Sequence, residues 1–217
     1  MTHFNIDITS DTVCPWCYIS HTRLRRAIAQ HTLTHPSDTF TLTYHPFQLS
    51  PTAPSPSEPK SALYHRLFGP ARTQLAQSRL TTLGAIEGIA FKFGGLTGNT
   101  RDSHRLVQLG KVEGGRDGMV RVVERLFGAY FEEERDIADV GVLVEVGVEA
   151  GLERGVVREW LESGGGGEVV DGEVEEARRR GVTGVPRVKV NGGWEVEGAG
   201  EVGEFLRVFE KVKEAEK

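Results

Sequence analysis

The motif Cys14-Pro15-Trp16-Cys17 constrains this chain more than any other feature, because it contains both cysteines of the sequence. Two cysteines in one short motif exclude a small secreted scaffold held together by several disulfides. Residues 4–9, just before the motif, alternate in the manner of a strand, and residues 15–30 have helical periodicity. The two thiols are therefore expected at a junction where a strand is followed by a helix.

Cys14 and Cys17 are predicted to have different roles in this setting. If Pro15 is the first residue of the helix, Cys14 occupies the N-cap position. The free backbone N–H groups and the positive end of the helix dipole would then favour its thiolate over its thiol. Cys17 lies one turn further, within reach of a disulfide. Cys14 is therefore the predicted nucleophile of thiol–disulfide exchange, and Cys17 the resolving thiol.

A zinc site and a purely structural pair are the alternatives for these cysteines. Structural zinc takes four ligands, and the sequence contains no second pair of this kind. Only His21, one turn after Cys17, could join on the same helical face. We therefore expect no metal site. The carboxylates of Asp7 and Asp11 are candidates for proton transfer with Cys17, but a strand role for Asp7 and a turn or cap role for Asp11 are the favoured interpretation.

The order of the remaining elements predicts an α/β fold. A second strand is expected over residues 39–47, followed by a connector that contains Pro51, Pro54, Pro56 and Pro59. Helices are expected over about 60–88, 99–110, 116–131, 139–150 and 153–162, with a glycine-rich loop at 163–167. Then follow a helix (168–180), a strand (185–190), a two-residue turn at Asn191-Gly192, a strand (194–197) and a helix (200–213).

This order is β-α-β, then helices only, then α-β-β-α. Two parts of one sheet therefore flank an all-helical insertion. The predicted division is one domain from residues 1–58 and 168–217, and a helical domain from residues 59–167.

Charge and hydropathy exclude several classes of partner. The net charge of −5 and pI of about 5.8 are not those of a nucleic-acid binder. No apolar run reaches the roughly 18 residues that a membrane span needs. The first eight residues lack the pattern of a secretory signal, so a reducing cytoplasmic location is expected.

Several segments resemble the DsbA-like, FrnE-type branch of the thioredoxin superfamily, in the same order and over almost the whole chain. The resemblance lies in residues 7–19 around the cysteines, 44–49 (Tyr-His-Pro-Phe-Gln-Leu), Asn99-Thr100 with 103–106, 126–131, and 181–186 through Gly198-Ala199. It implies a thioredoxin fold interrupted by a helical domain.

The resemblance also implies roles for individual residues. Cys14 matches the family nucleophile, Cys17 the resolving thiol, and Pro186 the cis-proline that faces them. A cis-proline turn would leave the Val185 backbone free to pair with an extended substrate. The substrate-binding candidates are Pro15, Trp16, Val185, Asn99 and His104. Arg187 and Lys189 depart from the apolar residues usual after the proline, which suggests a strand with one polar, accessible face.

A thiol–disulfide oxidoreductase without a bound cofactor is the primary hypothesis. Its expected partner is a disulfide-containing protein or peptide, or glutathione as co-substrate, with a homodimer as one arrangement and with no nucleic acid or membrane partner. The first alternative is a glutathione-dependent enzyme of the 2-hydroxychromene-2-carboxylate isomerase or kappa transferase type, although such relatives generally lack the second thiol. The second is a non-catalytic peptide-binding holdase.

Overall fold

A computed structural model describes residues 1–216 and divides into two compact units. The first unit contains Met1–Leu49 and the chain from Glu173 onward, and the second contains Ser50–Gly172. The boundaries predicted from the sequence lie elsewhere, after residue 58 and before residue 168. The proline-rich connector groups with the helical unit because its own residues bond there: Ser57 donates a hydrogen bond to Asp136 (3.0 Å), and Pro51 O accepts one from Asn99 (2.8 Å).

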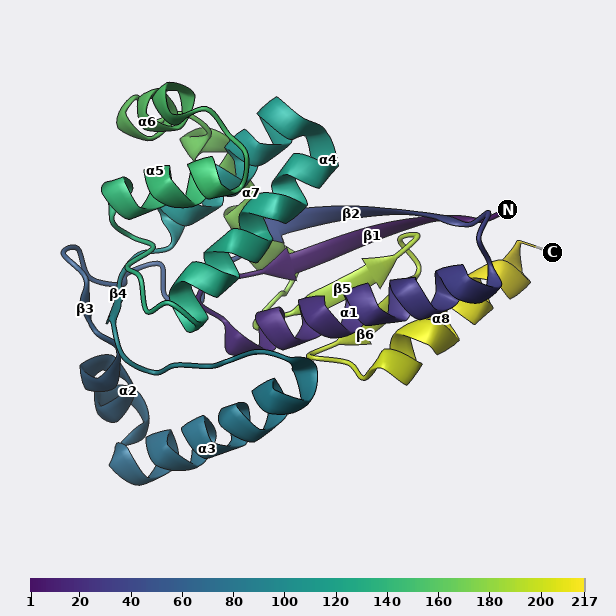
Figure 1. Ribbon diagram of the computed structural model, residues 1–217, viewed down its shortest axis with the longest axis horizontal. Coiled ribbons are helices and arrows are strands. Elements are labelled where there is room, and N and C mark those ends of the chain that lie inside the picture. The colour runs from purple at the N-terminus through teal and green to yellow at the C-terminus, as the bar shows by residue number, and fades with distance from the viewer. Residues whose placement is uncertain (217) are drawn as a thin grey trace. The chain divides into compact units, whose positions relative to one another are not determined.

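A four-stranded sheet forms the centre of the first unit (Figure 1). Its strands are β1 (His3–Ser10), β2 (Thr39–Pro46), β5 (Arg187–Val190) and β6 (Trp194–Glu197), in the order β2-β1-β5-β6. β1 runs parallel to β2 and antiparallel to β5. Of the two central strands, β1 comes from the first part of the sequence and β5 from the last part.

Two helices of the first unit, α1 (Pro15–Thr34) and α8 (Val202–Ala215), pack side by side (Figure 1). The alternation of β1 turns Phe4, Ile6 and Ile8 into the core, where all three are buried. The Phe4 ring lies 5.0 Å from that of Phe209 on α8. Burial of these side chains contributes about 1.5–3 kcal/mol each.

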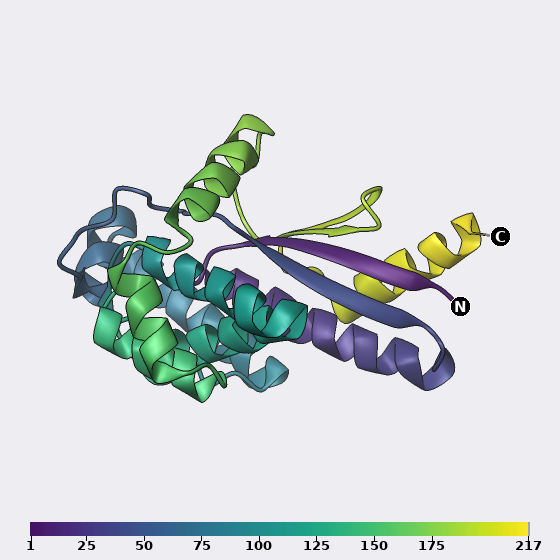
Figure 2. The same ribbon diagram turned by 90° about the horizontal axis from the view of Figure 1, so that it is seen from above.

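The opposite sheet face is polar, and α7 (Gly167–Arg179) approaches it through Glu173. Figure 2 shows α7 on the other side of the strands from α1. His45 on β2 bridges the Glu173 carboxylate (2.9 Å) and the Asp7 carboxylate on β1 (3.2 Å). The hydrogen bond with Glu173, and a weaker one with Asp7, raise the pKa of His45 although burial opposes this. Arg187 and Lys189 share one face of β5, as the sequence predicted, and both form ion pairs with Glu195.

The second unit contains the remaining helices and a two-stranded sheet of β3 (Glu58–Pro59) and β4 (Leu96–Thr97). The helices are α2 (Lys60–Phe68), α3 (Pro70–Glu87), α4 (Arg101–Phe131), α5 (Val140–Glu149) and α6 (Arg154–Glu162). The helix expected over residues 60–88 is broken at Gly69, whose φ of 75° and following proline interrupt the helical path. α4 covers both segments expected at 99–110 and 116–131, with non-helical backbone at Gly114 and Gly115.

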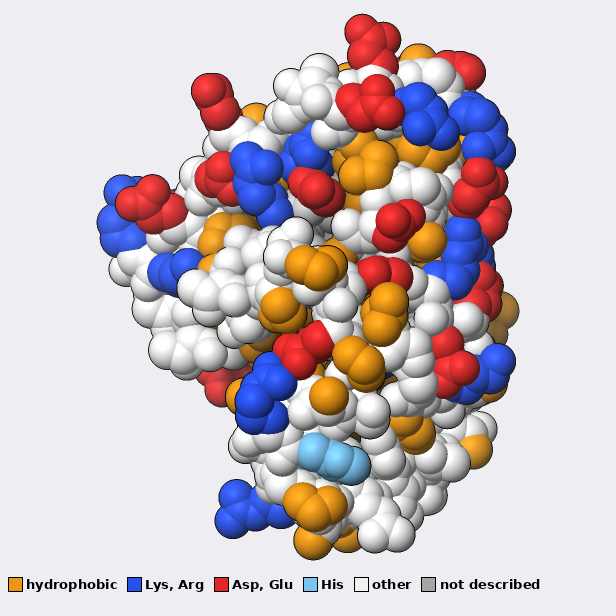
Figure 3. Space-filling model, turned by 90° about the vertical axis from the view of Figure 1, so that its left-hand side faces the viewer, with side chains coloured by type: hydrophobic (Ala, Val, Ile, Leu, Met, Phe, Trp, Pro, Cys, Tyr) orange, Lys and Arg blue, Asp and Glu red, His pale blue; other side chains and the backbone are white. Residues whose placement is uncertain are grey.

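The core of the second unit is formed by buried aliphatic and aromatic side chains of α4, α5 and α6, such as Leu106, Phe127, Leu143 and Val157. Figure 3 views the side of Figure 1 on which α2, β3 and β4 lie, where hydrophobic side chains are interspersed with acidic and basic ones. Among the helices of residues 1–216, none combines the length and apolar character that a bilayer crossing requires.

The end of the chain follows the expected order, with two local differences. Three residues, Asn191-Gly192-Gly193, connect β5 and β6, because Val190 pairs directly with Trp194. Asn191 and Gly192 both have positive φ, at 47° and 70°, which suits asparagine and glycine. The expected strand 185–190 begins at Arg187, because Pro186 has no N–H to donate to the sheet.

Candidate active site

Cys14 is the N-cap residue of α1, and Pro15 is at the start of that helix, which confirms the predicted junction. The backbone of Cys14 is extended (φ −91°, ψ 112°), and its carbonyl accepts hydrogen bonds from the N–H groups of Cys17 (3.0 Å) and Tyr18 (3.3 Å). The side chain makes no capping hydrogen bond. The Cys14 sulfur therefore lies at the N-terminus of a 20-residue helix without making a capping hydrogen bond to it.

The peptide bond between Val185 and Pro186 is cis, and the Cys14 thiol lies 3.6 Å from the Val185 carbonyl oxygen. The sheet register explains this approach. Thr9, near the end of β1, pairs with Arg187 at the start of β5, so the residues after β1 and before β5 meet at one edge. The motif and the Val185–Pro186 turn thus form one site, although they are separated by 171 positions.

Cys17 is deeply buried, with 3% of its surface exposed. Burial is the main reason why its pKa lies well above the usual value, and the neighbouring Cys14 acts in the same direction. The Ser10 hydroxyl and the Asp11 backbone hydrogen bond to Cys17 and oppose the shift. Both cysteines are free thiols in this structure.

Ser10 is a site residue that the sequence reasoning missed. The alternation of β1 could have identified it, because Ser10 shares the core face with Ile8 and directly precedes the motif turn. The carboxylates considered for proton transfer have other contacts. Asp11 accepts a hydrogen bond from the Leu49 N–H (2.7 Å), and Asp7 pairs with His45.

The other candidate residues are divided between the two units. Pro15 and Trp16 are half-buried beside the cysteines in the first unit. Asn99 and His104 belong to the second unit, where Asn99 precedes α4 and His104 is buried within it. Asn99 lines a polar cavity of about 430 Å³ together with Arg101, Asp136 and residues 54–57.

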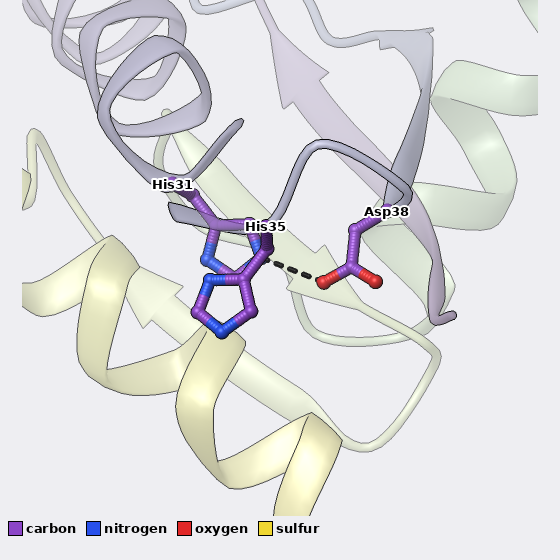
Figure 4. Close-up of side chains that lie close together, drawn as sticks. All are labelled: His31, His35 and Asp38. Atoms are coloured by element: carbon purple, nitrogen blue, oxygen red, sulfur yellow. Dashed lines mark hydrogen bonds and ion pairs between the residues drawn. The ribbon is translucent and has the colours of Figure 1, made fainter. Parts of the chain in front are cut away.

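His31, His35 and Asp38 form a cluster at the far end of α1 that could be considered for a metal (Figure 4). The two imidazole rings stack with centroids 4.5 Å apart and planes 17° apart. Their nitrogen lone pairs lie in nearly parallel planes and do not converge on one ion at bond lengths of about 2.0–2.1 Å. The Asp38 carboxylate is also bonded to Lys213. This geometry favours a hydrogen-bonded cluster over a metal centre.

The sheet order, the helix that begins beside Cys14 and the cis-proline opposite it define a thioredoxin-fold protein. The chain belongs to the DSBA-like thioredoxin domain family, whose model matches residues 5–209. No curated protein matches this sequence.

Solved structures agree with the fold over nearly the whole chain. A probable DsbA oxidoreductase from Streptomyces coelicolor is 27% identical, with a TM-score of 0.84 over 95% of this chain and 88% of that one. A 2-hydroxychromene-2-carboxylate isomerase is 18% identical, with a TM-score of 0.68 over 97% and 95% of the two chains. The cytosolic disulfide reductase DsbM from Pseudomonas aeruginosa, solved with GSH, is also 18% identical, with a TM-score of 0.61 over 96% and 98%.

Proposed function

We propose that this protein is a thiol–disulfide oxidoreductase in which Cys14 is the nucleophile and Cys17 the resolving thiol. The observation that carries the proposal is the 3.6 Å approach of the Cys14 sulfur to the Val185 carbonyl, beside a cis-proline. An extended substrate that pairs with the Val185 backbone would bring its own sulfur to this position. Trp16, between the two cysteines, offers an aromatic contact to such a substrate.

The chemistry proceeds in two exchanges. The Cys14 thiolate attacks one sulfur of a substrate disulfide, forms a mixed disulfide and releases the other substrate sulfur as a thiolate. The Cys17 thiolate then attacks the Cys14 sulfur, forms the internal disulfide and releases the second substrate thiolate. The substrate gains two electrons and the protein loses two. Two molecules of glutathione would return the protein to its dithiol form and leave as glutathione disulfide.

A glutathione-dependent isomerase or transferase is the alternative enzyme, supported by the likeness in fold to the isomerase and to DsbM. Such an enzyme activates glutathione and has no use for an internal disulfide, so its activity should survive Cys17→Ser. A peptide-binding holdase should tolerate loss of both cysteines. A cytosolic setting, such as that named for DsbM, is part of the primary proposal.

Reduction of insulin disulfides by the purified protein, with dithiothreitol or glutathione as electron donor, tests the proposal. Cys14→Ser should abolish the activity, and Cys17→Ser should accumulate a mixed disulfide that mass spectrometry detects. Full activity in Cys14→Ser would overturn the proposal. The reduction potential of the Cys14–Cys17 couple against glutathione then sets the direction: a value below that of the cytosolic pool indicates a reductant, and a value above it an oxidant or isomerase.

A further inference from the structure

Cys17 is a buried thiol that has to ionise within the protein. Its sulfur must carry a negative charge before it can attack the mixed disulfide, since the thiolate is the reactive form. Burial disfavours that charge by removing water from around the sulfur. A protein group that donates a hydrogen bond to the sulfur is therefore needed in place of water.

Two such donors meet the Cys17 sulfur at the end of β1. One is the Ser10 hydroxyl, and the other is the backbone N–H of Asp11. Ser10 is itself buried, and the backbone on both sides of it is fixed: its carbonyl accepts the Phe47 N–H (2.9 Å), and the Asp11 carbonyl accepts the Cys14 N–H (3.1 Å). The donors are thus held in place before any charge develops, which is the arrangement that stabilises a buried anion most effectively.

We propose that Ser10 is a catalytic residue of the release step, in which its hydroxyl, together with the Asp11 amide, stabilises the Cys17 thiolate. This inference rests on the proposed oxidoreductase function. Cys17 loses its proton to solvent, and its sulfur forms a bond to the Cys14 sulfur. The bond from Cys14 to the substrate sulfur breaks, and the substrate leaves as a thiolate that takes up a proton from water. Ser10 keeps its own proton throughout.

Ser20 provides a matched control for Ser10 within the same unit. It lies on α1 one turn after Cys17 and is as deeply buried, with 2% of its surface exposed. Within residues 1–216 its hydroxyl has no hydrogen-bond partner. Ser20→Ala therefore removes a buried hydroxyl near the motif without removing a contact to sulfur, whereas Ser10→Ala removes the contact.

Reaction of the reduced protein with the aromatic disulfide dithiobis(nitrobenzoate) separates the two steps. Attack by Cys14 releases one equivalent of coloured thiolate in a phase that depends on reagent concentration. Attack by Cys17 on the mixed disulfide releases the second equivalent in a phase that does not. Stopped-flow absorbance at one equivalent of reagent measures both rates in the wild type, Ser10→Ala and Ser20→Ala.

Ser10→Ala should leave the first phase unchanged and slow the second by about three- to tenfold near neutral pH. A hydrogen bond to a charged group changes an ionisation equilibrium by roughly tenfold or more, and about half of this on a logarithmic scale is returned because a more basic thiolate is a better nucleophile. For the same reason, the pH profile of the second phase should move to higher pH, and the variant should match or exceed the wild type at the alkaline plateau.

Unchanged second-phase rates and pH profile in Ser10→Ala would overturn the role of Ser10, and so would an equal slowing in Ser20→Ala. Failure of the proposed function gives a different result, because the wild type would then release one equivalent or none.

Discussion

Asp38 lies between α1 and β2, and only 1% of its side chain is exposed. Its carboxylate accepts hydrogen bonds from the Thr2 N–H (2.8 Å), from His31 Nε2 (2.9 Å) and from the Lys213 ammonium. Burial alone would raise the pKa of Asp38, but these three donors hold it well below its usual range. One carboxylate thus joins the start of the chain, the end of α1 and the end of α8.

Asp38→Asn preserves the shape of the side chain and removes its charge. Breaking a buried ion pair from one side costs about 3–5 kcal/mol. Because 23% of the Lys213 side chain is exposed, water can recover part of this loss, and we expect the free energy of unfolding to fall by about 2–4 kcal/mol. At roughly 2–4 °C per kcal/mol for a chain of this size, the melting temperature should drop by roughly 5–15 °C.

Urea unfolding of the wild type and Asp38→Asn at several pH values measures this effect. Because the pKa is depressed in the folded state, the contribution is fully present above the unfolded value of about 3.9 and declines as pH falls below it. The difference between the two proteins should therefore be constant from pH 5 to 7 and smaller at pH 3. Asp171→Asn, at an exposed pair with Arg101, is the control and should cost about 0–1 kcal/mol. A loss at Asp38 no larger than that of the control would refute the reasoning.

Two further predictions concern His45 and a pair of glycines, Gly118 in α4 and Gly172 in α7. Because the pKa of His45 is raised in the folded protein, the contribution of its charged form to stability is complete below the unfolded pKa of about 6.5. This contribution is lost as pH rises through the folded pKa. The free energies of unfolding of wild type and His45→Gln, measured in urea, should therefore converge between pH 6 and pH 8.5. A gap independent of pH would contradict this. Gly118→Ala should destabilise by about 1–3 kcal/mol, since its Cβ would lie 2.3 Å from the Gly110 carbonyl oxygen. Gly172→Ala, in open space within α7, should instead stabilise by about 0.5–1 kcal/mol in thermal unfolding; equal effects of the two alanines would disprove the steric argument.

Local signals in the sequence were enough to predict most elements of the fold. The alternation of residues 4–9 predicted β1, and proline after Cys14 predicted the start of α1. The order of strands and helices then limited the topology to a divided sheet. These features depend on neighbours in sequence, which is why they could be predicted without coordinates.

Features that depend on distant contacts were not predicted. The three-residue turn after Val190 depends on the register of β5 against β6. The break at Gly69 was missed although its signal, a glycine followed by a proline, is local. Ser10 was missed because its hydrogen bond to Cys17 depends on where Cys17 lies in the folded protein. The expected boundary lies on the other side of the proline-rich connector from the unit boundary, because composition marks such a connector but does not show which unit its side chains bond to.

The division of the sheet also has a consequence for biosynthesis. The segment that carries Cys14 and Cys17 leaves the ribosome well before β5, which pairs with β1 and is made only after the whole of Ser50–Gly172. The continuous middle portion can fold during translation, whereas the portion that carries the thiols has to wait for β5. We therefore expect nascent chains to expose both sulfurs to oxidants and chaperones until β5 has been synthesised.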